Sequence, residues 1–224
     1  MVHSEQEVMS LETKTKIHNS GVVISLVLEE LKHAVPVAIA LVKGGVDIIE
    51  LTLRTPVAMD AARAIINEVP GAVVGFGTVL TVQQVKECAE IGAHFAVAPG
   101  CNPRVIEAAK EYNLSFAPGI ATPTDIETAL EQGCRMLKYF PAETSGGIKH
   151  LTNMTAPYKH LGLSFLPLGG INPSNVASYL ESPLVGAIGG SWIATNKMIR
   201  EEAWDTITNN GLEIKKIINN IRKE

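Results

Sequence analysis

Short apolar runs alternate with longer amphipathic stretches along this chain, from about residue 22 to its end. Runs that are apolar throughout and only a few residues long are typical of strands buried on both faces of a parallel sheet. The predicted strands are residues 22–28, 46–53, 72–77, 94–98, 114–117, 135–140, 163–168 and 184–188. Helices are predicted between and after them, at 30–43, 56–68, 81–91, 102–112, 122–132, 147–160, 173–181 and 200–222.

Eight strand–helix units in 224 residues leave about 28 residues for each unit. Short units that alternate without a break favour an α/β fold of the closed (β/α)8 barrel type, a TIM barrel, over an open doubly wound sheet. No linker or shift in composition divides the chain, so a single domain over residues 1–224 is expected. Residues 1–20 are predicted to form an additional N-terminal helix that caps the bottom of the barrel.

Composition excludes several classes of protein. Hydrophobic residues make up 46% of the chain and charged residues only 19%, which is incompatible with global disorder. The net charge is −4 and no basic run occurs, so nothing indicates a nucleic-acid partner. The N-terminus lacks the apolar core of a signal peptide, and no apolar stretch is long enough to cross a membrane. Three cysteines without paired spacing indicate reduced thiols, and a soluble cytoplasmic protein is expected.

The second predicted strand carries charged groups that a buried strand would otherwise avoid. Side chains alternate along a strand, so Glu50, Thr52 and Arg54 share one face and the apolar residues between them share the other. A carboxylate and a guanidinium at the inner mouth of a barrel are costly unless they are paired or functional. The alternatives are therefore a structural ion pair and a catalytic acid or base with an anion-binding arginine.

The sixth predicted strand contains Lys138, with Met136 and Phe140 on the same face. Removal from water disfavours the ammonium form and makes the amine available as a nucleophile. This is the environment that a lysine needs in order to form a Schiff base. The alternative is a lysine at the strand mouth whose amine extends into water.

Glycine pairs follow the last two predicted strands. Gly169 and Gly170 come after the seventh, and Gly189, Gly190 and Ser191 come after the eighth. Loops at these positions of a barrel commonly bind phosphate through backbone N–H groups, and a serine adds a hydroxyl. The alternative is a pair of tight turns without a ligand. The Gly75-Phe76-Gly77 string lacks the rest of a dinucleotide-binding fingerprint. The six histidines lack ligand spacing, so no metal site is predicted.

Several strings at the predicted strand ends resemble one known family. They are GGVDIIELTLRT at 44–55, GFGTVL at 75–80, APG at 98–100, LKYFPAE at 137–143, GGI at 169–171 and GGSW at 189–192. In this order they resemble the class I aldolases for 2-keto-3-deoxy-6-phosphogluconate (KDPG), a family that includes 4-hydroxy-2-oxoglutarate (KHG) aldolase. The resemblance runs from about residue 20 to the last helix.

The resemblance implies a role for each matching residue. Lys138 would form the imine with the 2-keto group, and Glu50 would be the general acid and base. Arg54 and Thr78 would hold the carboxylate of pyruvate, and Pro99 would line the pyruvate pocket. Gly169, Gly170, Gly190 and Ser191 would bind the distal phosphate. The substrate would be a small 2-keto acid, the assembly a homotrimer, and neither a cofactor nor a metal would be required.

One departure from the family pattern bears on the substrate. Family members commonly read P-T-G-G after the seventh strand, whereas this chain reads Pro167-Leu168-Gly169-Gly170. Leu168 removes a hydroxyl near the substrate's C4 carbon or its phosphate. KDPG, its galactonate-derived epimer and KHG are therefore all possible substrates. A phosphate-binding barrel without catalytic activity is the alternative from a different functional class.

Overall fold

The computed structural model describes residues 7–222. Its strands lie close to the predicted apolar runs. They are β1 (Val22–Leu26), β2 (Ile48–Thr52), β3 (Val73–Gly77), β4 (Phe95–Val97), β5 (Phe116–Ala117), β6 (Gly119–Ile120), β7 (Met136–Tyr139), β8 (Ser164–Pro167) and β9 (Ile188–Gly190).

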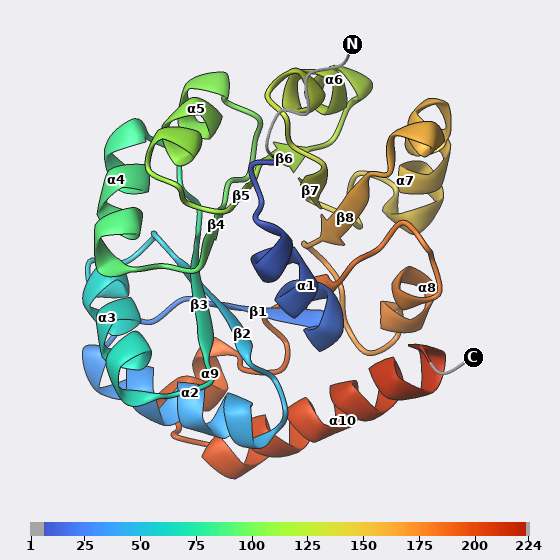
Figure 1. The fold of residues 1–224 in the computed structure, drawn as a ribbon. Helices are drawn as coiled ribbons and strands as arrows, with labels where there is room; N and C mark the ends of the chain where they lie inside the picture. The colour runs from blue at the N-terminus through green and yellow to red at the C-terminus, as the bar shows by residue number, and fades with distance from the viewer. Residues whose placement is uncertain (1–6, 223–224) are drawn as a thin grey trace.

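Helices connect successive strands and surround them on the outside (Figure 1). The α-helices are α1 (Leu11–Ser20), α2 (Ala34–Lys43), α3 (Ala58–Glu68), α4 (Val82–Ile91), α5 (Pro103–Glu111), α6 (Pro123–Glu131), α7 (Gly147–Thr155), α8 (Val176–Leu180), α9 (Asn196–Arg200) and α10 (Trp204–Arg222). Two 3-10 helices, η1 (Leu31–His33) and η2 (Ala156–Leu161), adjoin α2 and α7.

The strands of the described residues are parallel and belong to two sheets. The six-stranded sheet has the order β5-β4-β3-β2-β1-β9 and forms a half-barrel, and the second sheet has the order β6-β7-β8. Only an isolated bridge between Phe165 and Val185 links β8 to the segment before β9. One continuous eight-stranded sheet, as the sequence predicts, is therefore supported only in part.

Local chemistry explains where the strands depart from prediction. Pro118 separates β5 from β6, because proline has no N–H to donate; its carbonyl still accepts from the Lys138 N–H at 2.8 Å. The sequence predicts that the fifth strand ends before Pro118, whereas a further strand, β6, begins directly after this proline. The eighth begins at Ile188 and includes Gly189 and Gly190, which were expected to follow the strand. Both glycines pair with β1.

The inward-facing side chains of both sheets pack together in an inner cluster. It consists of Met9, Ile17, Val23, Ile48, Val73, Phe95, Val97, Ala117, Met136, Leu166, Leu168 and Ala187. Met9 and Ile17 come from the N-terminal segment, and α1 lies in front of the strands in Figure 1. The helix begins at Leu11, after the N-cap Ser10, so it is shorter than the predicted 1–20; residues 1–6 lie outside the described residues.

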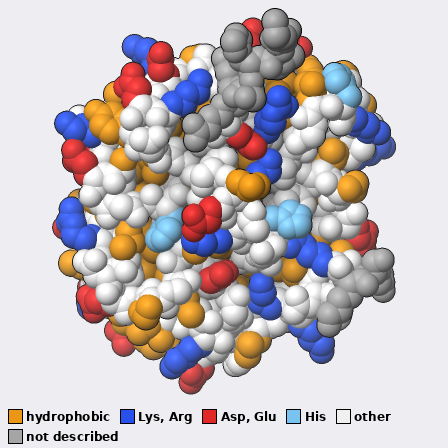
Figure 2. Space-filling view, in the orientation of Figure 1, with side chains coloured by type: hydrophobic (Ala, Val, Ile, Leu, Met, Phe, Trp, Pro, Cys, Tyr) orange, Lys and Arg blue, Asp and Glu red, His pale blue; other side chains and the backbone are white. Residues whose placement is uncertain are grey.

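Charges of both signs are mixed over the face seen in Figure 2, and hydrophobic side chains are scattered among them. This face therefore has no broad positive field that would attract a polyanion. Within residues 7–222, no helix is both long enough and apolar enough to span a membrane.

Two buried thiols make the stability of the fold sensitive to alkaline pH. Burial raises the pKa of Cys88 and of Cys134 from 9.0 to about 12. The folded protein therefore keeps both thiols protonated at a pH where the unfolded chain ionises them. This contribution to stability is complete below pH 9 and is lost as the pH rises from about 9 towards 12.

We expect the free energy of unfolding in urea to fall between pH 8 and pH 10, and to fall less in a Cys88→Ala, Cys134→Ala double variant. Equal pH dependence in the two proteins would contradict this origin. A comparison of the two slopes is required because tyrosines and lysines also ionise in this range.

Candidate active site

Lys138 and Glu50 meet in the interior, although they are far apart in sequence. The Lys138 Nζ lies 3.1 Å from Glu50 Oε1. The two side chains are only 6% and 1% exposed. The second carboxylate oxygen, Oε2, is buried and has no hydrogen-bond partner among the described residues. A buried amine and a buried carboxylate with one free oxygen can exchange a proton and still bind a further O–H group.

Two glycines on the neighbouring strand make room for this pair. A Cβ on Gly77 would lie 1.7 Å from Glu50 Oε1, and a Cβ on Gly75 would lie 2.5 Å from the ring of Phe95. Gly77 therefore allows the carboxylate to lie flat against β3, and Gly75 allows Phe95 to fill the space beside it. These are the glycines of the string that did not fit a dinucleotide-binding motif.

We expect Gly77→Ala to lower kcat about 10²-fold, since the new methyl group would displace the Glu50 carboxylate by an ångström or more. Gly100→Ala is the matched control, because a Cβ at Gly100 has nothing within 4 Å. Steady-state kinetics and melting temperatures of both variants would be measured. Normal activity of a folded Gly77→Ala variant would mean that the carboxylate position is not critical.

The surroundings of Lys138 are apolar. Its Nζ lies 5.4 Å from the centre of the Phe140 ring, which is within range for a cation–π contact. Its sheet neighbours are Gly119 on β6 and Leu166 on β8. Met136 belongs to the inner cluster and Phe140 packs against it, so both lie on the inward face of the strand with Lys138, as the sequence predicts. Glu50 is the one group of the described residues to which the Lys138 amine donates a hydrogen bond.

Arg54 and Thr78 follow the ends of β2 and β3. Arg54 is exposed, and its Nε donates to Thr52 Oγ1 at 3.3 Å, which in turn donates to the Leu26 carbonyl at 3.1 Å. Thr78 is half-buried and has a φ of 61°. A β-branched residue at positive φ is strained, and such strain gathers at functional sites. A cation and an unusual backbone conformation thus lie just beyond the ends of β2, which carries Glu50, and of its neighbour β3.

Pro99 lies two residues after the end of β4 and is half-buried. A Cβ on Gly119 would lie 2.2 Å from the Pro99 carbonyl carbon and oxygen. The Gly119 N–H donates to the Gly100 carbonyl at 3.2 Å. Glycine at 119 is therefore what lets the segment after β4 approach β6, beside Lys138.

The predicted distal loop after β8 is held by the segment after β7. Gly169 and Gly170 adopt φ of 96° and 87°, which favour glycine. The N–H groups of Ala142 and Glu143 donate to the carbonyls of Leu168 and Gly169 at 2.7 and 3.0 Å. The hydroxyl of Tyr179 on α8 donates to Glu143 Oε1. Burial and the Glu143 carboxylate raise the pKa of Tyr179, so the phenol keeps the proton that it donates.

The second predicted loop leaves β9 close to Leu168. Leu168 is only 4% exposed, and its side chain occupies the space where Gly189 would carry a Cβ. The Trp192 ring takes the equivalent space at Gly190. Ser191 is exposed and lies between Gly190 and Trp192 in the chain. Leu168 therefore contributes an apolar surface directly beneath the loop that begins at Gly190.

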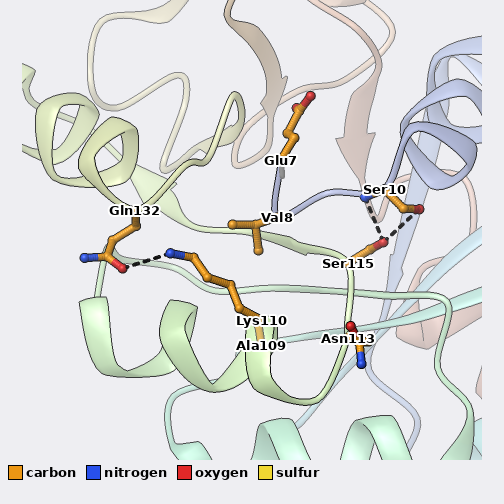
Figure 3. A pocket seen from close by; sticks show the side chains of 8 residues that line it. All are labelled: Glu7, Val8, Ser10, Ala109, Lys110, Asn113, Ser115 and Gln132. Atoms are coloured by element: carbon orange, nitrogen blue, oxygen red, sulfur yellow. Dashed lines mark hydrogen bonds between the residues drawn. The ribbon is translucent and has the colours of Figure 1, made fainter. Parts of the chain in front are cut away.

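A cavity of about 480 Å³ lies elsewhere, between the N-terminal segment and the ends of α5 and α6 (Figure 3). Its lining includes Ser10 and Ser115, which hydrogen-bond to each other, and Lys110, which donates to Gln132 at 3.4 Å. None of the predicted site residues lines it. Ser115 and Gln132 of its lining precede β5 and β7, whereas Arg54, Thr78 and Pro99 follow β2, β3 and β4. The predicted site residues therefore lie at the opposite ends of the strands from this cavity.

Residues 7–222 contain no group of three or more histidine, cysteine, aspartate or glutamate side chains that could hold a metal ion.

A lysine buried in apolar surroundings beside a carboxylate is the arrangement that a Schiff-base lysine requires, and it fits a lyase of that class. The chain belongs to the KDPG and KHG aldolase family, whose model matches residues 13–210. It is 44% identical to the KHG/KDPG aldolase of Escherichia coli K12 over 84% of this chain and 87% of that protein.

Two solved structures are similar to this one. The KDPG aldolase of Legionella pneumophila, with pyruvate captured as a covalent carbinolamine intermediate, has a TM-score of 0.85 and 35% identity, covering 90% of this chain and 97% of that chain. The KDPG aldolase of Zymomonas mobilis ZM4 with 3-phosphoglycerate has a TM-score of 0.81 and 35% identity, covering 90% and 96%.

Sequence reasoning missed the part played by neighbouring strands. The two-residue alternation along a strand predicts inward faces for Glu50 and Lys138, but it gives no reason for glycine at 75 and 77. It also passed over Glu143 and Tyr179, whose contact appears only when α8 packs beside the segment after β7. The signal for the glycines was the spacing of two along β3, which puts both on the face that Glu50 approaches.

Proposed function

We propose that this protein cleaves KDPG to pyruvate and glyceraldehyde 3-phosphate through a Schiff base on Lys138. The observation that carries the proposal is the buried Lys138–Glu50 pair at 3.1 Å. Membership of the KDPG and KHG aldolase family supports it. KHG, which gives pyruvate and glyoxylate, is proposed as a second substrate, because the family includes both activities.

Glu50 and Lys138 together supply the proton transfers. Glu50 accepts a proton from the Lys138 ammonium, and the neutral amine attacks the C2 carbonyl to give a carbinolamine. Glu50 then returns the proton to the carbinolamine hydroxyl, which leaves as water and gives the iminium with Glu50 again a carboxylate. Glu50 then takes the C4 hydroxyl proton as the C3–C4 bond breaks, and the bonding electrons pass to the iminium to form an enamine. The aldehyde leaves, Glu50 returns a proton to C3, and hydrolysis of the imine releases pyruvate.

The residues that follow β2, β3 and β4 are proposed to hold the pyruvate half of the substrate. Arg54 would bind the carboxylate with two N–H groups, which its contact through Nε to Thr52 leaves free. Thr78 would donate its hydroxyl to the same carboxylate. Pro99 would line the pocket on the side of β4. Fixing the carboxylate in this way holds C2 over the amine.

The glycines after β8 and at the end of β9 are proposed to bind the distal phosphate. Backbone N–H groups of Gly169, Gly170 and Gly190, with the Ser191 hydroxyl, would bind the anion, since a glycine has no side chain of its own to keep the anion from its backbone. The distal carboxylate of KHG is a second anion of suitable charge for the same loops. The contacts of Glu143 with the loop and with Tyr179 support a fixed geometry there.

Leu168 is proposed to influence the choice between KDPG and its galactonate epimer. We expect Leu168→Thr to shift the ratio of kcat/KM values for the two substrates by up to about tenfold, since a hydroxyl contact contributes roughly 1 kcal/mol. Leu168→Val is the matched control, because valine has the shape of threonine without the hydroxyl. The same shift in both variants would attribute the effect to side-chain volume.

Other features of the proposal concern the whole molecule. The inner cluster takes members from both sheets, which supports a closed (β/α)8 barrel in one domain.

Leu80 and Val82, which follow β3, are 51% and 46% exposed, and this exposure supports their burial in a homotrimer. Light scattering should give three times 24.0 kDa, and a monomer would contradict it. Three free cysteines support a reducing, cytoplasmic location.

Borohydride trapping with pyruvate, followed by peptide mass mapping, tests the central step. A reduced pyruvate adduct on Lys138 is expected. An adduct on a different lysine would overturn the site, and the absence of any adduct in folded protein would overturn the Schiff-base mechanism and favour a phosphate-binding barrel.

A further inference from the structure

Ser25 is a polar residue on the inner face of β1. Val22, Ile24 and Leu26 pack outward among the core residues against the helices, whereas Val23 belongs to the inner cluster. Since side chains alternate along a strand, Ser25 faces inward with Val23. Ser25 is half-buried, and its hydroxyl is not one of the fully buried side-chain atoms that lack a partner among the described residues, so it remains accessible. A hydroxyl that faces inward and is still accessible can hydrogen-bond to a molecule that enters the site.

The strand register places Ser25 between the two parts of the site. On one side its Cα partner on β2 is Glu50. On the other side its neighbour Ile24 pairs with Gly190 at the end of β9. Ser25 therefore lies between the carboxylate beside Lys138 and the strand end from which the Ser191 loop departs.

A bound substrate must span the same interval. In the proposed binding mode, C2 lies at Lys138 and the terminal anion lies at the glycine loops. The hydroxylated carbons between them then pass β1, which lies between Glu50 on β2 and Gly190 on β9. Leu168 lies beneath the Gly190 loop and presents only carbon atoms. Among the inward-facing residues of β1, Ser25 is the one with a hydroxyl to offer.

We propose that the Ser25 hydroxyl binds the hydroxyl group next to the aldehyde carbon of the incoming or leaving aldehyde, and that it selects 2-hydroxyaldehydes over aldehydes that lack this group. The inference rests on the proposed aldolase function and deepens it. Ser25 is a specificity-determining residue and takes no part in the formation of the imine on Lys138.

The experiment measures pyruvate addition to two aldehydes, glyceraldehyde 3-phosphate and 3-oxopropyl phosphate, which differ only in that hydroxyl. Ser25→Ala should lower kcat/KM for glyceraldehyde 3-phosphate about five- to tenfold and leave that for 3-oxopropyl phosphate within about twofold. Ser25→Thr keeps a hydroxyl on the same carbon and should restore the preference. Equal losses with both aldehydes, or no loss with either, would overturn the proposal.

Ser164→Ala is the matched control. Ser164 lies on the inner face of β8, two residues before Leu166, but at the opposite end of the strands beside Gly186. Its kcat/KM for both aldehydes should remain unchanged, and a selective loss like that of Ser25→Ala would mean that the effect is not local.

Borohydride trapping with pyruvate alone separates this proposal from the function on which it rests. Pyruvate lacks the aldehyde half, so the wild type and Ser25→Ala should form the Lys138 adduct equally well. An adduct in both, together with equal losses for the two aldehydes, would leave the aldolase function standing and refute the role of Ser25. No adduct in the wild type would refute both.

Discussion

Replacement of Lys138 by alanine is expected to lower aldol cleavage by at least about 10⁴-fold and to abolish the borohydride-trapped pyruvate adduct. The amine is the nucleophile, and no other described lysine contacts Glu50. Alanine also leaves the Glu50 carboxylate buried and unpaired, which costs stability of about 3–5 kcal/mol. Cleavage would be followed by the release of pyruvate, and folding by circular dichroism.

Lys138→Arg separates chemistry from stability. Arginine keeps a positive partner for Glu50 but does not form an imine, so this variant should be inactive and better folded than Lys138→Ala. The matched control is Lys16→Ala, which removes an exposed lysine paired with Glu12 at 2.7 Å on α1. It should retain full activity, because exposed ion pairs contribute little. Turnover by folded Lys138→Arg would disprove the Schiff-base assignment.

Glu50→Gln is expected to lower kcat for cleavage about 10³-fold. The amide preserves the size of the side chain and an acceptor for Lys138, but it cannot take the C4 hydroxyl proton. Because the carboxylate also removes the proton from Lys138, the pyruvate adduct should form more slowly and still appear on Lys138. Rapid-quench trapping and steady-state cleavage measure the two steps separately.

The control for this variant is Glu12→Gln, which removes the acid of the exposed pair on α1 and should leave both steps unchanged. If Glu50→Gln cleaved KDPG at the normal rate, another group would have to be the base. If it formed no adduct at all, Glu50 would be required already for imine formation, and the loss of cleavage would be attributed to that first step.

The chain's own pattern is sufficient for much of this picture. Alternating apolar runs and amphipathic stretches predict parallel strands covered by helices, since only buried strands are apolar on both faces. The two-residue period of a strand places Glu50 and Lys138 inward. Burial of an unpaired charge is unfavourable, so a charged residue within an apolar strand is conspicuous. For this reason the amino-acid pattern alone singles out both residues as candidates for the site.

The register between strands could not be predicted in this way. The strand register pairs Glu50 with Gly75 on β3 and with Ser25 on β1. This pairing brings Gly75 and Ser25 beside Glu50. The break at Pro118 and the extension of β9 through Gly189 and Gly190 also arise from contacts with neighbouring strands. From local propensity alone, such glycines are predicted to be turn residues. The propensity of a residue does not show which neighbouring side chain fills the position where its Cβ would lie.

The amino-acid sequence by itself determined the order of strands and helices, the inward acid and lysine, and the glycine-rich segments at the strand ends, because each depends on the periodicity of a single segment. The tertiary structure decided that the Lys138 Nζ and Glu50 Oε1 stand 3.1 Å apart, that Gly77 leaves room for the carboxylate, and that Thr78 adopts a φ of 61°. These features depend on segments far apart in the chain, whose side chains compete for the same space only after the strands have paired.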